Sequence, residues 1–188
     1  MKITLVRHTE VEESYHKCYN GHIEIGLSQK GKEDAKRLAK IFENKYFEKV
    51  YCSDLRRTRE TLALFSQAKD AIYTELLREK SWGRHEGKTF ESIIAEGEIE
   101  YENFLEWIYA LDGEDYEIFR ERIRNFFLKK LIDEPYESVL VITHAGVIRV
   151  LMALVQKLSL EEAFSIDVPY SSYVIFDTKK MIFTKMKL

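Results

Sequence analysis

Short apolar runs alternate along the chain with segments in which apolar side chains recur at helical spacing. Four runs rich in Val, Ile, Leu and Tyr predict strands. They cover residues 3–6, 50–52, 71–73 and 139–142. Four segments with apolar positions at i, i+3, i+4 and i+7 predict amphipathic helices. They cover residues 35–42, 55–65, 101–111 and 119–131. Residues 147–155 are apolar nearly all round, which predicts a buried helix.

Several polar residues indicate where these elements begin. Ser28 stands before the first helical segment and is expected to cap it. Ser159 and Glu162 have the spacing of a capping box, which predicts another short helix. Two further apolar runs, residues 173–176 and 181–183, flank a polar stretch and predict a closing hairpin.

The alternation of strands and helices predicts an α/β fold. We expect a three-layer α/β/α sandwich with a mostly parallel central sheet, in which residues 139–142, the most apolar run, lie at the centre. Residues 82–115 contain no strand-like run and predict a small helical cap. At 188 residues the chain is expected to form a single domain, residues 1–188.

Composition narrows the possible partners. Hydrophobic residues make up 45% and charged residues 32%, and 29 Lys plus Arg against 32 Asp plus Glu give a net charge of −3. This balance predicts no general attraction to nucleic acid or to a membrane. No apolar run approaches the ~18 residues of a membrane span. Cys18 and Cys52 do not suggest a disulfide framework or a zinc site, so we expect a cytoplasmic protein.

Residues suited to catalysis follow each of the first four predicted strands. Arg7 and His8 follow the first strand, Arg57 lies just after the second, Glu79 follows the third and His144 follows the fourth. Because the carboxyl ends of parallel strands lie at one edge of a sheet, we expect these side chains to converge there.

The chemistry of these side chains suits a phosphate ester. Guanidinium groups match the oxygens of phosphate, and two helices that start near Leu55 and Ala145 would direct N–H groups at the same place. A neutral histidine can attack phosphorus, and a carboxylic acid can protonate the leaving oxygen. No cluster of acids is placed to hold Mg²⁺, so we expect no metal and no other cofactor.

Five segments of the chain resemble, in order, the motifs of the histidine phosphatase (phosphoglycerate mutase-like) superfamily. They are LVRHTE at 5–10, GHIEIGLSQKG at 21–31, SDLRRTRET at 53–61, LREKSWGRHEG at 77–87 and THAGVIR at 143–149. The segment around residues 18–28 is most similar to the alpha-ribazole phosphatase branch. The resemblance implies the α/β/α fold and a phosphohistidine intermediate, without a metal or cofactor.

The resemblance also implies roles for individual residues. His8 matches the phosphorylated histidine, Glu79 the proton donor and His144 the second histidine at the phosphoryl group. Arg7 and Arg57 match the arginines that bind phosphate. Residues expected to contact the substrate in addition to these are Ser14, Asn20, Gly21 and the N–H group of Ala145.

Some positions leave alternatives open or depart from the family pattern. Glu86 is a rival to Glu79 for the acid, and Arg56 and Arg59 neighbour Arg57. Thr9, Ser14 and Ala145 stand where relatives carry Gly, Asn and Gly. Among the aromatic residues of the cap, Trp107 lies off the main apolar stripe and is the candidate for a pocket wall.

The sequence therefore predicts a metal-independent phosphomonoesterase that acts on a small phosphorylated metabolite, as a monomer or homodimer. The first candidate substrate is alpha-ribazole 5′-phosphate of cobalamin synthesis. Alternatives within the superfamily are a phosphoglycerate mutase and a phosphatase for phosphoserine or sugar phosphates. A non-catalytic phosphate-binding module is the alternative outside enzyme chemistry.

Overall fold

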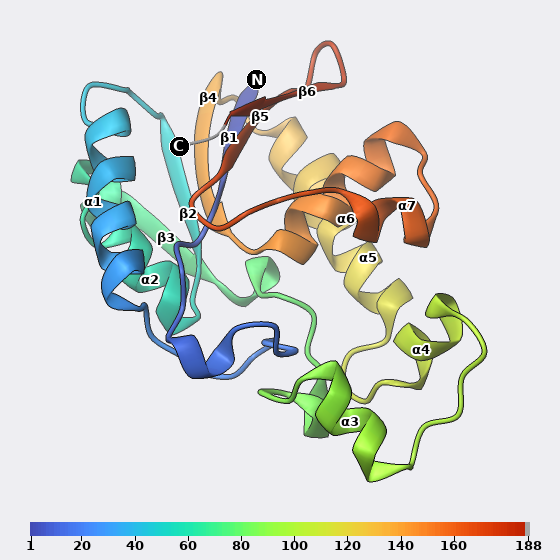
Figure 1. Ribbon diagram of the computed structural model, residues 1–188. Helices are drawn as coiled ribbons and strands as arrows, with labels where there is room; N and C mark the ends of the chain where they lie inside the picture. The colour runs from blue at the N-terminus through green and yellow to red at the C-terminus, as the bar shows by residue number, and fades with distance from the viewer. Residues whose placement is uncertain (187–188) are drawn as a thin grey trace.

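A six-stranded mixed sheet forms the centre of the protein in a computed structural model that describes residues 1–186 (Figure 1). The strands are β1 (Lys2–Arg7), β2 (Lys49–Ser53), β3 (Ala71–Thr74), β4 (Ser138–Thr143), β5 (Tyr173–Asp177) and β6 (Ile182–Met186). Their order in the sheet is β3-β2-β4-β1-β5-β6. The first four strands pair in parallel, whereas β5 is antiparallel to β1 and β6 is antiparallel to β5. The predicted strands, the mostly parallel sheet, the position of β4 and the closing hairpin are confirmed.

Helices cover both faces of this sheet, as the sandwich prediction requires (Figure 1). One face carries α1 (Gln29–Phe42) and α2 (Arg56–Leu62). The other face carries α5 (Tyr116–Asn125), α6 (Ala145–Gln156) and α7 (Leu160–Ser165). No helix formed by residues 1–186 is long and apolar enough to cross a membrane.

The two-residue period of the strands builds the two cores. Along β1, Leu5 packs into the core beneath α5 and α6, whereas Val6 packs into the core beneath α1 and α2. Along β4, Val141 and Ile142 separate in the same way, and both are fully buried. Because successive side chains of a strand point to opposite faces, a continuous apolar run is needed where helices cover both faces.

Capping interactions fix where the helices start. The Ser28 side chain accepts the N–H of Gly31 at 2.9 Å and caps α1. Ser159 and Glu162 form the predicted capping box of α7. The helical segment predicted at 119–131 continues beyond α5 as a wider π-helical turn, Phe126–Lys130.

Two short helices, α3 (Phe90–Glu96) and α4 (Phe104–Ala110), lie beyond the carboxyl edge of the sheet (Figure 1). As predicted, residues 82–115 contribute no strand to the sheet. Their apolar side chains form a separate cluster around Trp82, Trp107 and Leu111. The indole N–H of Trp107 donates to the Tyr19 hydroxyl at 2.7 Å, and this contact ties the cap to the loop after β1.

Candidate active site

The register of two neighbouring strands brings His8 and His144 together. Arg7 of β1 pairs with Thr143 of β4 in the parallel ladder, and the His8 N–H donates to the Thr143 carbonyl at 2.9 Å. Each histidine is therefore the next residue beyond a paired position, on strands that lie ~4.8 Å apart. The ring centroids are 5.2 Å apart, so the predicted convergence of the two imidazoles is present in the structure.

The surroundings of His8 keep its imidazole neutral. The side chain is 5% exposed, and burial together with the charges of Arg57 and Arg7 lowers its pKa well below the usual value. Nδ1 lies 2.8 Å from the Thr9 carbonyl oxygen, which can only accept a hydrogen bond. The proton is therefore assigned to Nδ1, and Nε2 carries a lone pair that is suited to nucleophilic attack.

His144 lies still deeper in the protein. It is fully buried, and burial followed by the charges of Arg57, His8 and Arg7 lowers its pKa well below the usual value. Its Nε2 lies 2.8 Å from the hydroxyl of Ser53, the last residue of β2. Its Nδ1 is buried and has no hydrogen-bond partner among residues 1–186.

Only one of the three neighbouring arginines of α2 is directed inward. Arg57 is 1% exposed and donates to the carbonyl oxygens of Asn20, Gly21 and Ile23 at 2.7–3.2 Å. Burial lowers its pKa to about 10, so it stays charged at neutral pH. The two rivals lie on the surface.

Arg56 and Arg59 instead form exposed ion pairs, with Glu60 and Glu24 respectively. Of these three arginines, Arg57 alone is buried, and it is also the one that matches the family motif.

Arg7 is held by the loop that precedes β5. Its Nη1 donates to the Val168 carbonyl at 2.5 Å, and its guanidinium carbon lies 3.8 Å from the centroid of the Tyr170 ring. The Tyr170 ring is also 5.5 Å from that of His8. One face of the guanidinium group is therefore covered, which leaves its edge for a ligand.

Three buried nitrogens around these rings lack hydrogen-bond partners within the described part of the chain. They are Nε of Arg7, Nε of Arg57 and Nδ1 of His144. Native proteins satisfy nearly all buried polar atoms, so a cluster of unpartnered nitrogens needs an explanation. The two arginines supply a charge of +2, which matches the charge of about −1.5 to −2 on a phosphate monoester.

The structure also distinguishes the two candidate acids. The Glu79 carboxylate lines the same cavity as His8 and accepts the N–H groups of Gly146 at 2.9 Å and Lys80 at 3.0 Å. Glu86 does not line this cavity. Its Oε1 accepts three hydrogen bonds from neighbouring donors, so this carboxylate holds the surrounding loops together. The donors are His22 N–H, Ser81 O–H and Trp82 N–H.

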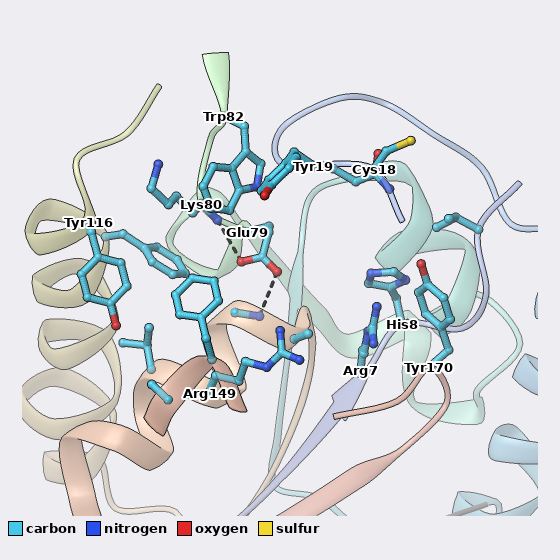
Figure 2. A pocket seen from close by; sticks show the side chains of 18 residues that line it. Arg7, His8, Cys18, Tyr19, Glu79, Lys80, Trp82, Tyr116, Arg149 and Tyr170 are labelled. Carbon is cyan, nitrogen blue, oxygen red and sulfur yellow. Dashed lines mark hydrogen bonds between the residues drawn. The ribbon is translucent and has the colours of Figure 1, made fainter. Parts of the chain in front are cut away.

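A cavity of about 220 Å³ begins at His8 and extends between α5, α6 and α7 (Figure 2). The part of the cavity around His8 is mostly polar. The residues there are Arg7, His8, Asn20, Glu79, Ala145 and Tyr170. The part toward α5 and α7 combines aromatic rings with two basic side chains. The residues there are Lys80, Trp82, Tyr116, Phe119, Arg149 and Phe164.

Four of the residues predicted to contact the substrate do not line this cavity: Ser14, Gly21, Arg57 and His144. Ser14 is exposed and lies outside the cavity lining, so the geometry does not support the expected contact with substrate. Gly21 is buried behind the lining, where a Cβ would lie 2.5 Å from the Lys80 carbonyl oxygen. The cavity also leaves out Trp107, which is 3% exposed and packs inside the cap cluster. The prediction of Trp107 as a pocket wall is wrong, because its one polar atom is satisfied by Tyr19 within that cluster.

The family pattern matches the chain over almost its whole length. The model of the histidine phosphatase superfamily (branch 1) covers residues 3–186. The chain belongs to this superfamily. Among curated relatives, adenosylcobalamin/alpha-ribazole phosphatase of Escherichia coli is 27% identical over 158 residues, 81% of this chain and 78% of the relative. Phosphoserine phosphatase 1 of Hydrogenobacter thermophilus is 24% identical over 180 residues, 93% of this chain and 85% of the relative.

Solved structures of other histidine phosphatases share the fold. The crystal structure of the alpha-ribazole phosphatase from Shigella flexneri superposes with a TM-score of 0.83 and covers 100% of this chain and 96% of that one, at 24% identity. The sequence relatives support the resemblance to the alpha-ribazole phosphatase branch.

Tyr170 and Arg149 line the cavity of this histidine phosphatase, although the sequence predicted a role for neither. Tyr170 lies on a loop, and neither its spacing nor its type indicated that it would cover Arg7. Arg149 belongs to a recognised motif segment, but no role was assigned to it. Thr9, in contrast, turns its hydroxyl toward Thr61 and away from the cavity, so this departure does not narrow the site.

Among residues 1–186, no group of three or more His, Cys, Asp or Glu side chains is arranged to hold a metal ion.

Proposed function

We propose that this histidine phosphatase is a phosphomonoesterase that forms a phosphohistidine on His8. The observation that carries the proposal is the group of unpartnered buried nitrogens on Arg7, Arg57 and His144 around a neutral imidazole. A bound phosphoryl group would accept hydrogen bonds from the two arginine nitrogens, and from Nδ1 of His144 in the tautomer in which Nε2 accepts from the Ser53 hydroxyl. Donors that are held in place before the reaction stabilise the charge on the equatorial oxygens in the transition state.

The reaction proceeds in two displacements. Nε2 of His8 attacks phosphorus and the bond to the leaving oxygen breaks, while Glu79 in its acid form donates a proton to that oxygen. Water then attacks the phosphohistidine and Glu79 takes one of its protons, so that inorganic phosphate leaves and His8 is free again. The N–H groups of Gly146 and Lys80 hold the carboxylate in position for both steps.

The decisive experiment is hydrolysis of p-nitrophenyl phosphate in excess EDTA. We expect activity in the wild type, loss of at least 1,000-fold in His8→Ala, and an acid-labile phosphoenzyme only in the wild type. His16→Ala is the matched control, because His16 does not line the cavity. Equal activity of wild type and His8→Ala would reject the assignment, and no activity in either would favour a phosphate-binding module.

A mutase would return the phosphoryl group to the product. Incubation with 3-phosphoglycerate separates the two activities, because a mutase forms 2-phosphoglycerate and a phosphatase releases inorganic phosphate. We expect phosphate release, and formation of 2-phosphoglycerate without phosphate would refute the hydrolase proposal.

Two classes of substrate are supported by relatives of this chain. Alpha-ribazole 5′-phosphate is the first candidate, because relatives from Escherichia coli and Salmonella typhimurium are named as phosphatases for it at 27% and 29% identity. That substrate would place the enzyme in cobalamin synthesis. Phosphoserine is the second candidate and is supported by the relative from Hydrogenobacter thermophilus. Initial rates on both compounds compare them directly.

We further propose a cytoplasmic setting, in which the enzyme acts as a monomer or homodimer on a small metabolite rather than on nucleic acid or a membrane. The net charge of −3 and the free thiols of Cys18 and Cys52 support this setting.

A further inference from the structure

One arginine of α5 holds the backbone of residues 76–79, the segment that ends in Glu79. Nη1 of Arg122 donates to the carbonyl oxygens of Leu76 at 3.0 Å and Arg78 at 2.9 Å. Its Nη2 donates to the Glu79 carbonyl at 3.4 Å. No helix or strand within residues 1–186 includes Arg78 or Glu79, so the course of the chain there depends on contacts from other elements.

Two further side chains contact the same segment. The hydroxyl of Thr143, the last residue of β4, donates to the Leu77 carbonyl at 2.8 Å. Nε2 of His22 lies 2.9 Å from the Glu79 carbonyl oxygen. All four carbonyl oxygens of the segment thus accept hydrogen bonds from side chains, and Arg122 makes three of these bonds.

Glu114, at the end of the cap, balances the charge of Arg122. Nε and Nη2 of the arginine donate to the two carboxylate oxygens of Glu114 at 2.9 and 2.7 Å, and each side chain is 15% exposed. A bidentate pair of this kind fixes the plane of a guanidinium group as well as its position. Because the pair uses Nε and Nη2, Nη1 is left for the carbonyl oxygens of the segment.

The route from Arg122 to the reaction leads through Glu79. Arg122 does not line the cavity that contains His8, so it acts through another residue rather than on the substrate. The Lys80 N–H, which donates to the Glu79 carboxylate at 3.0 Å, belongs to the same stretch of backbone (Figure 2). A shift of this backbone therefore moves both the acid and one of the donors that hold its carboxylate. Misplacement by ~1 Å costs about 100-fold in rate.

We propose that Arg122 is a positioning residue, which directs the Glu79 carboxylate by holding the backbone of residues 76–79, and that Glu114 orients Arg122 for this task. The inference rests on the proposed phosphatase function, in which Glu79 protonates the leaving oxygen. Arg122 should then matter most for leaving groups that need a proton. An ion pair with a purely structural role would affect all substrates alike.

The test compares two esters that differ in the basicity of the leaving group. Phenolate needs a proton more than nitrophenolate does, so the ratio of kcat/KM for phenyl phosphate to kcat/KM for p-nitrophenyl phosphate reports proton donation. We expect Arg122→Gln to lower this ratio about tenfold or more, toward the ratio of Glu79→Gln.

Arg122→Lys separates position from charge. The lysine keeps the charge opposite Glu114, but one nitrogen with three donors cannot replace the five hydrogen bonds of Arg122. This variant should therefore lower the ratio as well. An unchanged ratio in Arg122→Lys overturns the proposal, even where Arg122→Gln fails to fold.

A control and a double variant assign the effect to its residue. Arg120→Gln is the matched control, because Arg120 lies on the same helix and pairs with Glu117 outside the cavity. An equal fall of the ratio in this control overturns the proposal. In Glu79→Gln, the addition of Arg122→Gln should lower the ratio little further, because the acid is already absent. A further fall of about tenfold in the double variant also overturns the proposal.

Failure of this inference is distinguishable from failure of the proposed function. A lowered ratio in Glu79→Gln with wild-type ratios in both Arg122 variants leaves the phosphatase and its acid standing and removes the role of Arg122. A wild-type ratio in Glu79→Gln overturns the assignment of the acid and this inference with it. Absence of hydrolysis of both esters by the wild type overturns the proposed function as well.

Discussion

Gly146→Ala tests whether the position of Glu79 matters for catalysis. Gly146 lies in the first turn of α6, and its N–H donates to the Glu79 carboxylate at 2.9 Å. A Cβ at this position would lie 2.0 Å from Oε1 and 2.8 Å from the carboxyl carbon of Glu79. Since ordinary contacts begin at 3.4 Å, this oxygen has to move about 1.4 Å away from the added atom.

The size of the effect follows from that displacement. A shift of ~1 Å in a catalytic group costs about 100-fold in rate, within the 10²–10⁴ that general acid catalysis contributes. We therefore expect kcat/KM for alkyl phosphates to fall about 100-fold in Gly146→Ala. The loss should be much smaller for p-nitrophenyl phosphate, because nitrophenolate leaves without needing a proton. The difference between the two substrates is the signature of a displaced acid.

Measurements of Tm and a double-mutant cycle with Glu79 distinguish a displaced carboxylate from a general loss of folded protein. Alanine in place of glycine in a helix favours folding by ~0.5–1 kcal/mol, so Tm should not fall unless the strain spreads beyond Glu79. Glu79→Gln should lose activity on the same substrates, and the double variant should lose little more. Wild-type rates on alkyl phosphates in Gly146→Ala, or losses that multiply in the double variant, would refute the role of Glu79.

Three further outcomes follow from the same site. His8 and His144 have lowered pKa values, so the unfolded chain binds protons that the native protein does not, and acid below pH ~6.5 destabilises the fold. The unfolding free energy of the wild type relative to that of His144→Asn should therefore fall by up to about 1.4 kcal/mol for each unit by which the pH is lowered. Plots of unfolding free energy against pH that run parallel for the two proteins would contradict this. A lysine at position 57 cannot keep the three hydrogen bonds of Arg57 to carbonyl oxygens, so Arg57→Lys should lower the free energy of unfolding in denaturant melts by about 2–3 kcal/mol. An unchanged denaturation midpoint would argue against this structural role of Arg57. Tyr170→Leu should raise the Ki of inorganic phosphate about 2- to 30-fold by uncovering Arg7, whereas Tyr170→Phe should not, and equal effects would assign the role to the hydroxyl.

The sequence by itself determined the fold and the inner part of the site. Apolar runs such as residues 139–142 predicted strands buried on both faces, because such a run can be buried only where helices cover both faces of the sheet. The positions of His8 and His144 directly after two such runs were sufficient to predict their meeting, since parallel strands place their carboxyl ends at one edge. Both inferences depend on local period and on strand direction, which are properties of the chain itself.

Only the tertiary structure decided between side chains with the same local pattern. Glu79 and Glu86 stand seven residues apart in one motif, and the contacts of residues distant in sequence show which carboxylate faces the cavity. The prediction that Trp107 forms a pocket wall was wrong for the same reason, because its hydrogen-bond partner Tyr19 lies 88 positions earlier in the sequence. Arg149 resembles any helical arginine in sequence, and only the fold places it in the cavity lining with its Nε bonded to the Ile166 carbonyl. Which way a side chain turns depends on the surfaces that meet around it, and those surfaces exist only once the chain has folded.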